Sequence, residues 1–305
     1  MIDQTLVRDV HLKANPILRR ELNKIPLPIK RHTLQRYFWI VVTLVTAATL
    51  VISYGGGMSY CSRYYRACSL SDLTLYSINQ SLFPVIAIGS LLVGLLFDFY
   101  FVSLPAGRLL REKQSGHWEL LRTTPFPITQ IVASKYATAQ FRAWRVLAVE
   151  VALRGAVSVI IVGSFLLSYT TESYGTNAGI FLSEITFFVI ISLVYVLEPV
   201  WRMRMLVSMG LAIAMQMRSV TSVALADLGA LLAMRIVQAV LVFLYILGIS
   251  LLIRMMNPNY ASSFYSEWFY LFVTGGFGAC IYVFYRLGRR WLLRRALRLS
   301  YPVYR

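Results

Sequence analysis

Histidine and cysteine are both scarce in this chain, which has three of each among its 305 residues. The histidines, His11, His32 and His117, all lie outside the long apolar runs, so none is expected inside a membrane as a ligand for haem or a metal. The sequence also lacks the phosphate loop G-x-x-x-x-G-K-[ST], the H-E-x-x-H pattern and the G-x-S-x-G pattern. We therefore expect no catalytic residue, no metal site and no cofactor on this chain.

Acidic residues are few as well, with 13 Asp and Glu against 30 Lys and Arg and a net charge of +17. Only 14% of the residues are charged and 58% are hydrophobic. The mean hydropathy is +0.63. Such a composition excludes an ordinary soluble domain and indicates a protein that crosses a membrane several times.

Six apolar runs are each long enough, at about 20 helical residues, to cross a hydrocarbon core ~30 Å thick. They lack the alternation of apolar and polar residues that barrel strands show. Backbone groups in lipid must be hydrogen-bonded within their own segment, so helices are expected. The predicted fold is an all-α integral membrane protein with a transmembrane domain over 37–286 and spans near 37–56, 81–104, 146–168, 179–198, 236–254 and 268–286.

The basic residues are distributed unevenly among the segments that connect these runs. If the N-terminus is cytosolic, 26 of them fall on the inner side: eight before Tyr37, seven over 105–145, four over 199–235 and seven from Arg286 onward. This asymmetry satisfies the positive-inside rule and also predicts an attraction for anionic membrane lipid of the inner leaflet. We expect a plasma (inner) membrane protein with both termini in the cytosol. No nucleic acid is expected as a partner, since no motif for it is present.

The two ends of the chain, over 1–36 and 287–305, are predicted to be basic cytosolic segments. In the first, four apolar residues between Ile17 and Ile25 recur at helical spacing with basic residues between them. This pattern fits a helix that lies on the membrane surface, and it also fits an ordinary solvated basic helix.

Two further segments leave alternatives open. Cys61 and Cys68 fall in the first outer loop, where a disulfide between them and a pair of free thiols are both compatible with the sequence. The segment 199–235 is either an interfacial helix followed by a cytosolic extension of the fifth span, or a tight extra hairpin.

Three charged residues are expected to form a polar cluster in the inner half of the membrane: Asp98, Glu150 and Arg154. An unpartnered arginine near the centre of a span costs about 2.5–3.5 kcal/mol on insertion scales, so Arg154 is expected to have a partner. Glu150 lies one helical turn before it. Asp98 lies about six residues from the inner end of the second span, a depth that Arg154 can match. The cluster would either lock helices together or contact a substrate.

The polar stretch "EKQSGHWELLRTTPFP", residues 112–127, interrupts the most apolar part of the chain. Gly116 can end the second span, and the three-residue spacing of Trp118 and Leu121 places both side chains on one face of a short helix. Pro125 then stops that helix and redirects the chain. These features predict a short rigid lever, and the alternative is an interfacial helix with Trp118 at the headgroup level.

This stretch resembles the first cytoplasmic loop of the permease subunits of ABC-type exporters of the second class, which carries E-R-E-x-G-T-L-E-L-L-L-T-T-P and then I-L-L-G-K. The chain departs from that pattern at Gln114, His117, Trp118 and Ser134. "NPILRREL", residues 15–22, is likewise similar to the N-P-x-L-x-[KR]-E-L opening of many of these permeases. The matching positions of the loop are Glu112, Gly116, Glu119, Leu120, Leu121, Thr123, Thr124, Pro125 and Lys135.

In that family the matching loop forms a coupling helix that sits on a separate ABC ATPase subunit. The resemblance therefore implies that ATP and Mg bind to the partner ATPase and not to this chain. It also implies alternate-access transport of an unidentified substrate, by a homodimer or by this chain with a homologous permease partner. Trp118 would fill a pocket on the ATPase, with Glu119 and Arg122 at the rim. The alternative function is a non-transporting structural or assembly subunit of a larger membrane complex.

Overall fold

The computed structural model describes residues 83–171, 178–217, 219–255 and 265–300, and three helical residues at 40, 43 and 47. The predicted N-terminal segment, most of the first span and the loop with Cys61 and Cys68 lie outside the described residues. Within them the chain is helical and contains no strand. The helices are α6 (Phe83–Gln114), α7 (His117–Arg122), α8 (Ile128–Thr171), α9 (Ala178–Gln216), α10 (Val220–Met255) and α11 (Tyr265–Ser300).

Three stretches of these helices are long and apolar enough to cross a membrane: Leu92–Gln114 in α6, Ile185–Gln216 in α9 and Val220–Gly248 in α10. The prediction of an all-helical membrane protein is confirmed to this extent. The full set of six spans stays a prediction.

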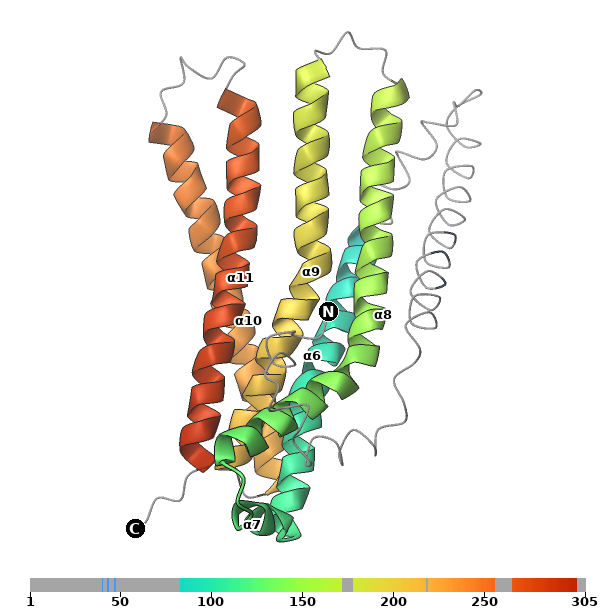
Figure 1. Ribbon diagram of the computed structural model, residues 1–305. Coiled ribbons are helices and arrows are strands. Elements are labelled where there is room, and N and C mark those ends of the chain that lie inside the picture. The colour runs from blue at the N-terminus through green and yellow to red at the C-terminus, as the bar shows by residue number, and fades with distance from the viewer. Residues whose placement is uncertain are drawn as a thin grey trace.

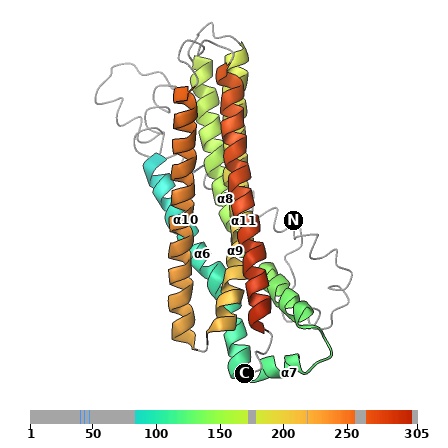
Figure 2. The ribbon, with the colours of Figure 1, turned by 90° about the vertical axis from the view of Figure 1, so that its left-hand side faces the viewer.

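The later part of α8 lies along α9, with α10 and α11 beside them, while α6 and the first part of α8 run obliquely (Figures 1 and 2). Helix α9 is the centre of the arrangement, because it packs against α11, α6 and α8. The short helix α7 lies at one end of the molecule, beyond the end of α6, and α11 ends toward the same end (Figure 2). We call this the α7 end of the bundle.

The second half of α9 forms the core of the molecule toward the α7 end. From Met203 to Met215 nearly all of its apolar side chains are buried, so this part of the helix is apolar on every side. Val102 on α6 and Ile131 on α8 belong to the same cluster. Tyr136, also buried, donates its hydroxyl to the carbonyl oxygen of Arg204 at 3.2 Å, which ties α8 to α9.

Gly210 allows α6 and α9 to cross closely. A Cβ at this position would overlap the carbonyl oxygen of Val102 and lie 2.9 Å from Cγ of Pro105. Small residues at helix crossings permit such a close backbone approach in membrane proteins. The crossing therefore depends on the missing side chain.

In the segment 199–235 the structure contains the predicted extension of the fifth span, but its first part continues α9 and is not a separate helix. Helix α9 continues through Pro199 to Gln216, and α10 begins at Val220 after a short turn, so the segment extends these two helices. The physical reason is burial, because the first part of the segment fills the core between α6 and α8. A run too short to span alone is thus the C-terminal half of a longer helix.

Helix α11 crosses the predicted boundary between the sixth span and the basic tail without a break. It contains 36 residues, from Tyr265 to Ser300. At a rise of 1.5 Å per residue its length is about 54 Å. This exceeds a hydrocarbon core of ~30 Å, so the predicted sixth span is only part of a longer helix.

Candidate functional site

A turn of two residues separates α6 from α7, and Gly116 makes it possible. Its φ is +73°, a left-handed conformation that glycine adopts without the steric penalty of a Cβ. The N–H groups of Ser115 and Gly116 donate to the carbonyl oxygens of Arg111 and Lys113 at 3.0 and 3.2 Å. These bonds satisfy carbonyls at the end of α6, and the Gly116 carbonyl in turn accepts from the N–H of Glu119 at 3.1 Å.

The threonine pair after α7 closes that helix. The hydroxyls of Thr123 and Thr124 donate to the carbonyl oxygens of Leu120 and Leu121 at 2.8 and 2.5 Å. Such bonds from Ser and Thr side chains to nearby backbone satisfy carbonyls that a helix end leaves open. The exposed Pro125 then turns the chain toward α8.

One face of α7 is buried and the other is exposed, and the predicted anchor Trp118 lies on the buried face. Trp118 is only 4% exposed and belongs to the chain's own core, with Leu121 packed against that core. The chain's own core thus covers the indole, and the role of Trp118 as an anchor for a partner stays a prediction. The outward side chains are Leu120, which is 65% exposed, and Glu119, whose carboxylate pairs with Arg122 at 3.1 Å.

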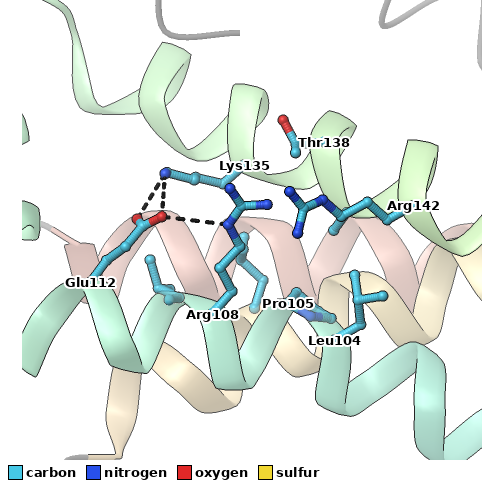
Figure 3. A pocket seen from close by; sticks show the side chains of 10 residues that line it. Leu104, Pro105, Arg108, Glu112, Lys135, Thr138 and Arg142 are labelled. Carbon is cyan, nitrogen blue, oxygen red and sulfur yellow. Dashed lines mark hydrogen bonds and ion pairs between the residues drawn. The ribbon is translucent and has the colours of Figure 1, made fainter. Parts of the chain in front are cut away.

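Glu112 and Lys135, both positions of the family resemblance, meet across the loop. The Lys135 ammonium lies 2.7 Å from Oε2 of Glu112 and 2.8 Å from its Oε1, which joins α6 to α8 (Figure 3). Arg108 approaches the same carboxylate at 3.7 Å. The cavity beside this pair is lined by Pro105 and Thr138, among others, and its volume is about 20 Å³. That is about the room that one water molecule needs, so it is not a substrate pocket.

Lys113 joins the end of α6 to α9. Its ammonium donates to the carbonyl oxygens of Ala214 and Met215 at 2.8 and 2.9 Å. These carbonyls belong to the last turn of α9, where a cation is favourable both as a donor and toward the helix dipole. The base of the loop is thus fixed to α8 by one lysine and to α9 by another.

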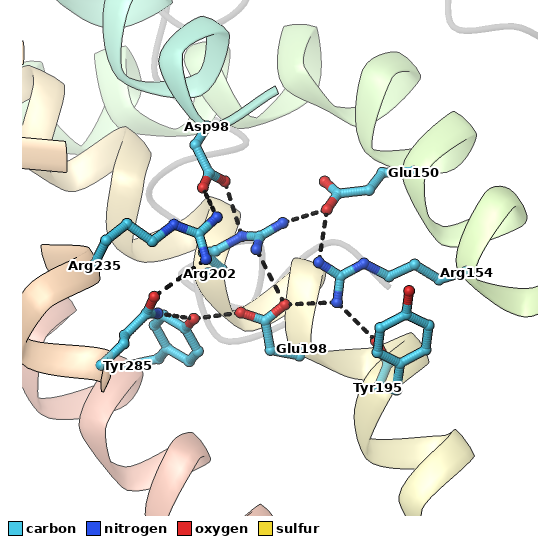
Figure 4. A network of polar contacts seen from close by, with 9 residues as sticks. Asp98, Glu150, Arg154, Tyr195, Glu198, Arg202, Arg235 and Tyr285 are labelled. Atoms are coloured by element: carbon cyan, nitrogen blue, oxygen red, sulfur yellow. Dashed lines mark hydrogen bonds and ion pairs between the residues drawn. The ribbon is translucent and has the colours of Figure 1, made fainter. Parts of the chain in front are cut away.

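A second site, which we call the charge network, lies deeper in the bundle and centres on Arg202 of α9 (Figure 4). Its guanidinium contacts three carboxylates: Oδ1 of Asp98 at 2.8 Å, Oε1 of Glu150, and Oε2 of Glu198 at 3.4 Å. The planar guanidinium can serve several acceptors at once, which a lysine could not do with the same geometry. Arg202 is 2% exposed.

Arg154 of α8 forms one side of the charge network. It lies 3.1 Å from Oε1 of Glu150 and 2.9 Å from Oε2 of Glu198. It also donates to the carbonyl oxygen of Tyr195 at 3.1 Å, and its guanidinium lies 4.7 Å from the centre of the Tyr195 ring.

The other side of the charge network brings in α10 and α11. Arg235 pairs with Oδ2 of Asp98, and Gln238 donates to the hydroxyl of Tyr285. That hydroxyl donates to Oε1 of Glu198. Side chains from α6, α8, α9, α10 and α11 therefore meet in one connected set (Figure 4).

The charges of the network balance, since its three carboxylates are matched by three guanidinium groups. Charged side chains in a membrane are tolerated when they face the bundle interior and pair with one another. The arrangement holds five helices at one level and leaves none of its charged groups without an opposite charge. Its simplest chemical role is to fix the helix packing.

The structure brings Asp98, Glu150 and Arg154 into the same network, but it adds members that sequence reasoning missed. Asp98 pairs with Arg202 and Arg235, while Arg154 pairs with the two glutamates. A usable signal was present, because Glu198 and Arg202 are four residues apart in an apolar segment, the spacing of an ion pair on one helix. The missed residues are Glu198, Arg202, Arg235 and Tyr285.

No protein-family model and no curated protein matches the sequence. Among the described residues, no group of three or more His, Cys, Asp or Glu side chains is arranged to hold a metal ion. The loop from Glu112 to Lys135 and the charge network are two candidate sites within the described chain.

Proposed function

We propose that this chain is the transmembrane permease subunit of an ABC-type exporter in the plasma (inner) membrane, with six spans and both termini in the cytosol. The loop from Glu112 to Lys135 would be its coupling element for a separate ATPase subunit. ATP and Mg would bind to that ATPase. A second copy of this chain, or a homologous permease, would complete the transport path.

The observation that carries this proposal is that the residues of the family resemblance build one projecting lever. Gly116 ends α6, the pair Thr123 and Thr124 ends α7, and the ion pair of Glu112 and Lys135 holds the two ends of the loop together. These positions match the family pattern and each has a structural task. If the likeness in sequence were accidental, the matched residues would not be expected to stabilise the same loop.

The burial of Trp118 favours a role in which this residue holds α7 on the bundle, whereas the predicted role was contact with the ATPase. An indole packed into the core fixes α7 to the bundle, so a displacement of α7 would act on α6, against which it packs. The partner contact then passes to the outward face, where Leu120 offers an exposed apolar side chain beside Glu119. An exposed leucine with polar neighbours is suited to fill a pocket on another protein.

The charge network favours a second function, a non-transporting structural or assembly subunit. Ion pairs join four helices, and hydrogen bonds of Tyr285 add α11 as a fifth, which is expected of a rigid unit. Alternate access requires helices to move relative to one another. In an exporter the five helices of the charge network would have to move as one body. The transport path would then lie between two such subunits.

The two functions can be distinguished by identifying the protein that binds α7. The tagged full chain would be purified gently from its native membrane, together with a Leu120→Asp variant and a Leu120→Met variant that keeps an apolar side chain. We expect an ATPase with a phosphate loop to co-purify with the unmodified chain and the Met variant. Its recovery should fall about thirtyfold with Asp, since truncating an interface anchor typically costs about 2 kcal/mol or more. Recovery of other membrane subunits, and never of an ATPase, would support the assembly role instead.

A further inference from the structure

The outward face of α11 changes from apolar to basic near the α7 end of the bundle. Val283, Leu287 and Trp291 follow one another at four-residue spacing and are exposed, at 48%, 59% and 58%. Four-residue spacing puts them on one face. On the opposite face, Tyr285 and Leu292 are buried against the bundle.

Three arginines continue this outward face toward the end of the helix. Arg290, Arg294 and Arg298 are exposed and again four residues apart. Arg294 follows Leu287 by seven residues and Trp291 by three, so the basic row is continuous with the apolar one. No hydrogen bond or ion pair joins these three guanidinium groups to another described residue.

No acidic residue in this part of the sequence balances the charge of this face. From residue 268 to residue 305 the sequence contains neither Asp nor Glu. In the charge network, by contrast, each arginine contacts at least one carboxylate. The helix dipole favours a cation only in the last turn, which accounts for Arg298 but not for Arg290 and Arg294.

The position of Trp291 marks where this face leaves the hydrocarbon. Helix α11 is longer than the hydrocarbon core, and tryptophan side chains are enriched at the boundary between hydrocarbon and headgroups. The indole is also covered on one side by Arg295, whose guanidinium lies 5.3 Å from the ring. Leu287 then lies on the hydrocarbon side, and the three arginines lie at headgroup level and beyond.

We propose that Arg290, Arg294 and Arg298 bind the phosphate groups of anionic phospholipids in the adjoining leaflet, with Trp291 and Leu287 packed against the acyl chains. Guanidinium groups bind phosphate oxygens with paired hydrogen bonds, and the apolar row supplies the contact that a free anion cannot use. This lipid-binding face requires only that α11 crosses the membrane. It does not depend on an ATPase partner.

The test measures binding of phosphatidylglycerol and phosphatidylcholine to the purified full chain by native mass spectrometry. Replacement of Arg290, Arg294 and Arg298 by Gln should lower the affinity for phosphatidylglycerol about tenfold or more and leave phosphatidylcholine unchanged, since each basic residue near an anionic surface contributes about fivefold. Replacement of the same three by Lys should retain most of the preference. A matched loss of charge at Arg63, Arg66 and Arg254 should have little effect. All variants should unfold at the same temperature in phosphatidylcholine.

Three results would overturn the proposal. The first is an unchanged preference for phosphatidylglycerol in the Gln variant. The second is displacement of the lipid by millimolar inorganic phosphate, which would assign the arginines to a soluble anion. The third comes from a photoreactive amino acid at position 291 in the native membrane: cross-links to a protein in place of phospholipid would show a protein interface there.

Discussion

Lys135 on α8 holds Glu112 on α6 in a nearly buried ion pair, with Nζ 2.7 Å from Oε2, although the two residues are 23 positions apart. Their side chains are 9% and 19% exposed. The contact closes the base of the loop that carries α7. It therefore ties the C-terminal end of α6 to the N-terminal part of α8.

A double-mutant cycle should measure this contact. We expect Glu112→Gln and Lys135→Met to be coupled by about 1–3 kcal/mol in the free energy of unfolding, because the two groups share one interaction and are mostly shielded from water. The exposed pair of Glu119 and Arg122 is the matched control, with a coupling of about 0.3–0.5 kcal/mol or less. Equal couplings for the two pairs would contradict the structural role of the first.

Gly210 and Gly229 should respond to alanine in opposite directions. Gly210→Ala places a Cβ against the carbonyl oxygen of Val102, and relief requires a backbone shift that typically costs about 1–3 kcal/mol. A Cβ at Gly229 would meet no atom within 4 Å. Gly229→Ala should therefore stabilise α10 slightly, by up to about 1 kcal/mol. Thermal unfolding of both variants in one detergent checks the pair.

Two buried aspartates provide a similar contrast. Asp98 pairs with Arg202 and Arg235, so Asp98→Asn leaves the buried guanidinium of Arg202 and the half-buried one of Arg235 less compensated. This should destabilise the protein by about 3–5 kcal/mol. Asp227 is 1% exposed, and no hydrogen bond or ion pair joins its carboxylate to another described residue. Asp227→Asn removes an unpaired buried acid and should be neutral or stabilising. A comparable loss in both variants would show that Asp227 has a partner.

Arg202 should be the least replaceable member of the charge network. Arg202→Gln leaves three carboxylates with less compensation, and we expect a loss of about 3–5 kcal/mol. Arg202→Lys should restore only part of it, because one ammonium cannot reproduce a planar contact with three acceptors. Arg235→Gln is the milder control, since Arg235 pairs with one carboxylate and its side chain is 27% exposed. Chemical unfolding in a defined detergent mixture ranks the three variants.

The sequence was sufficient to predict the helical membrane class, the loop and three members of the charge network. Asp98, Glu150 and Arg154 could be placed in one cluster because relative depth along a span follows directly from helix rise. Arg235 and Tyr285 could not be assigned in the same way. Their contact with the network depends on how α10 and α11 are rotated about their axes, and long helices that are apolar on most sides give no signal for that rotation.

The orientation of α7 shows the same limit on a smaller scale. The spacing of Trp118 and Leu121 predicts that they share a face, and they do lie on the buried side together. Periodicity cannot say whether such a face meets a partner or the chain's own core. That choice was decided by tertiary packing, because α7 lies against α6 and Trp118 joins the chain's own buried cluster.

Substitutions at Trp118 and at Leu120 should therefore change the free energy of unfolding by very different amounts. Trp118→Ala removes a buried indole and should lower the free energy of unfolding by about 3–5 kcal/mol, whereas Leu120→Ala, on the outward face, should change it by less than about 0.5 kcal/mol. Single cysteines at the two positions, in a chain without its native cysteines, give a second readout. An impermeant maleimide should label position 120 rapidly in inside-out vesicles and position 118 much more slowly. Labelling of position 120 from outside intact cells would overturn the cytosolic assignment of the loop. A Trp118→Ala variant of unchanged stability that failed to bind the ATPase would return Trp118 to the partner interface.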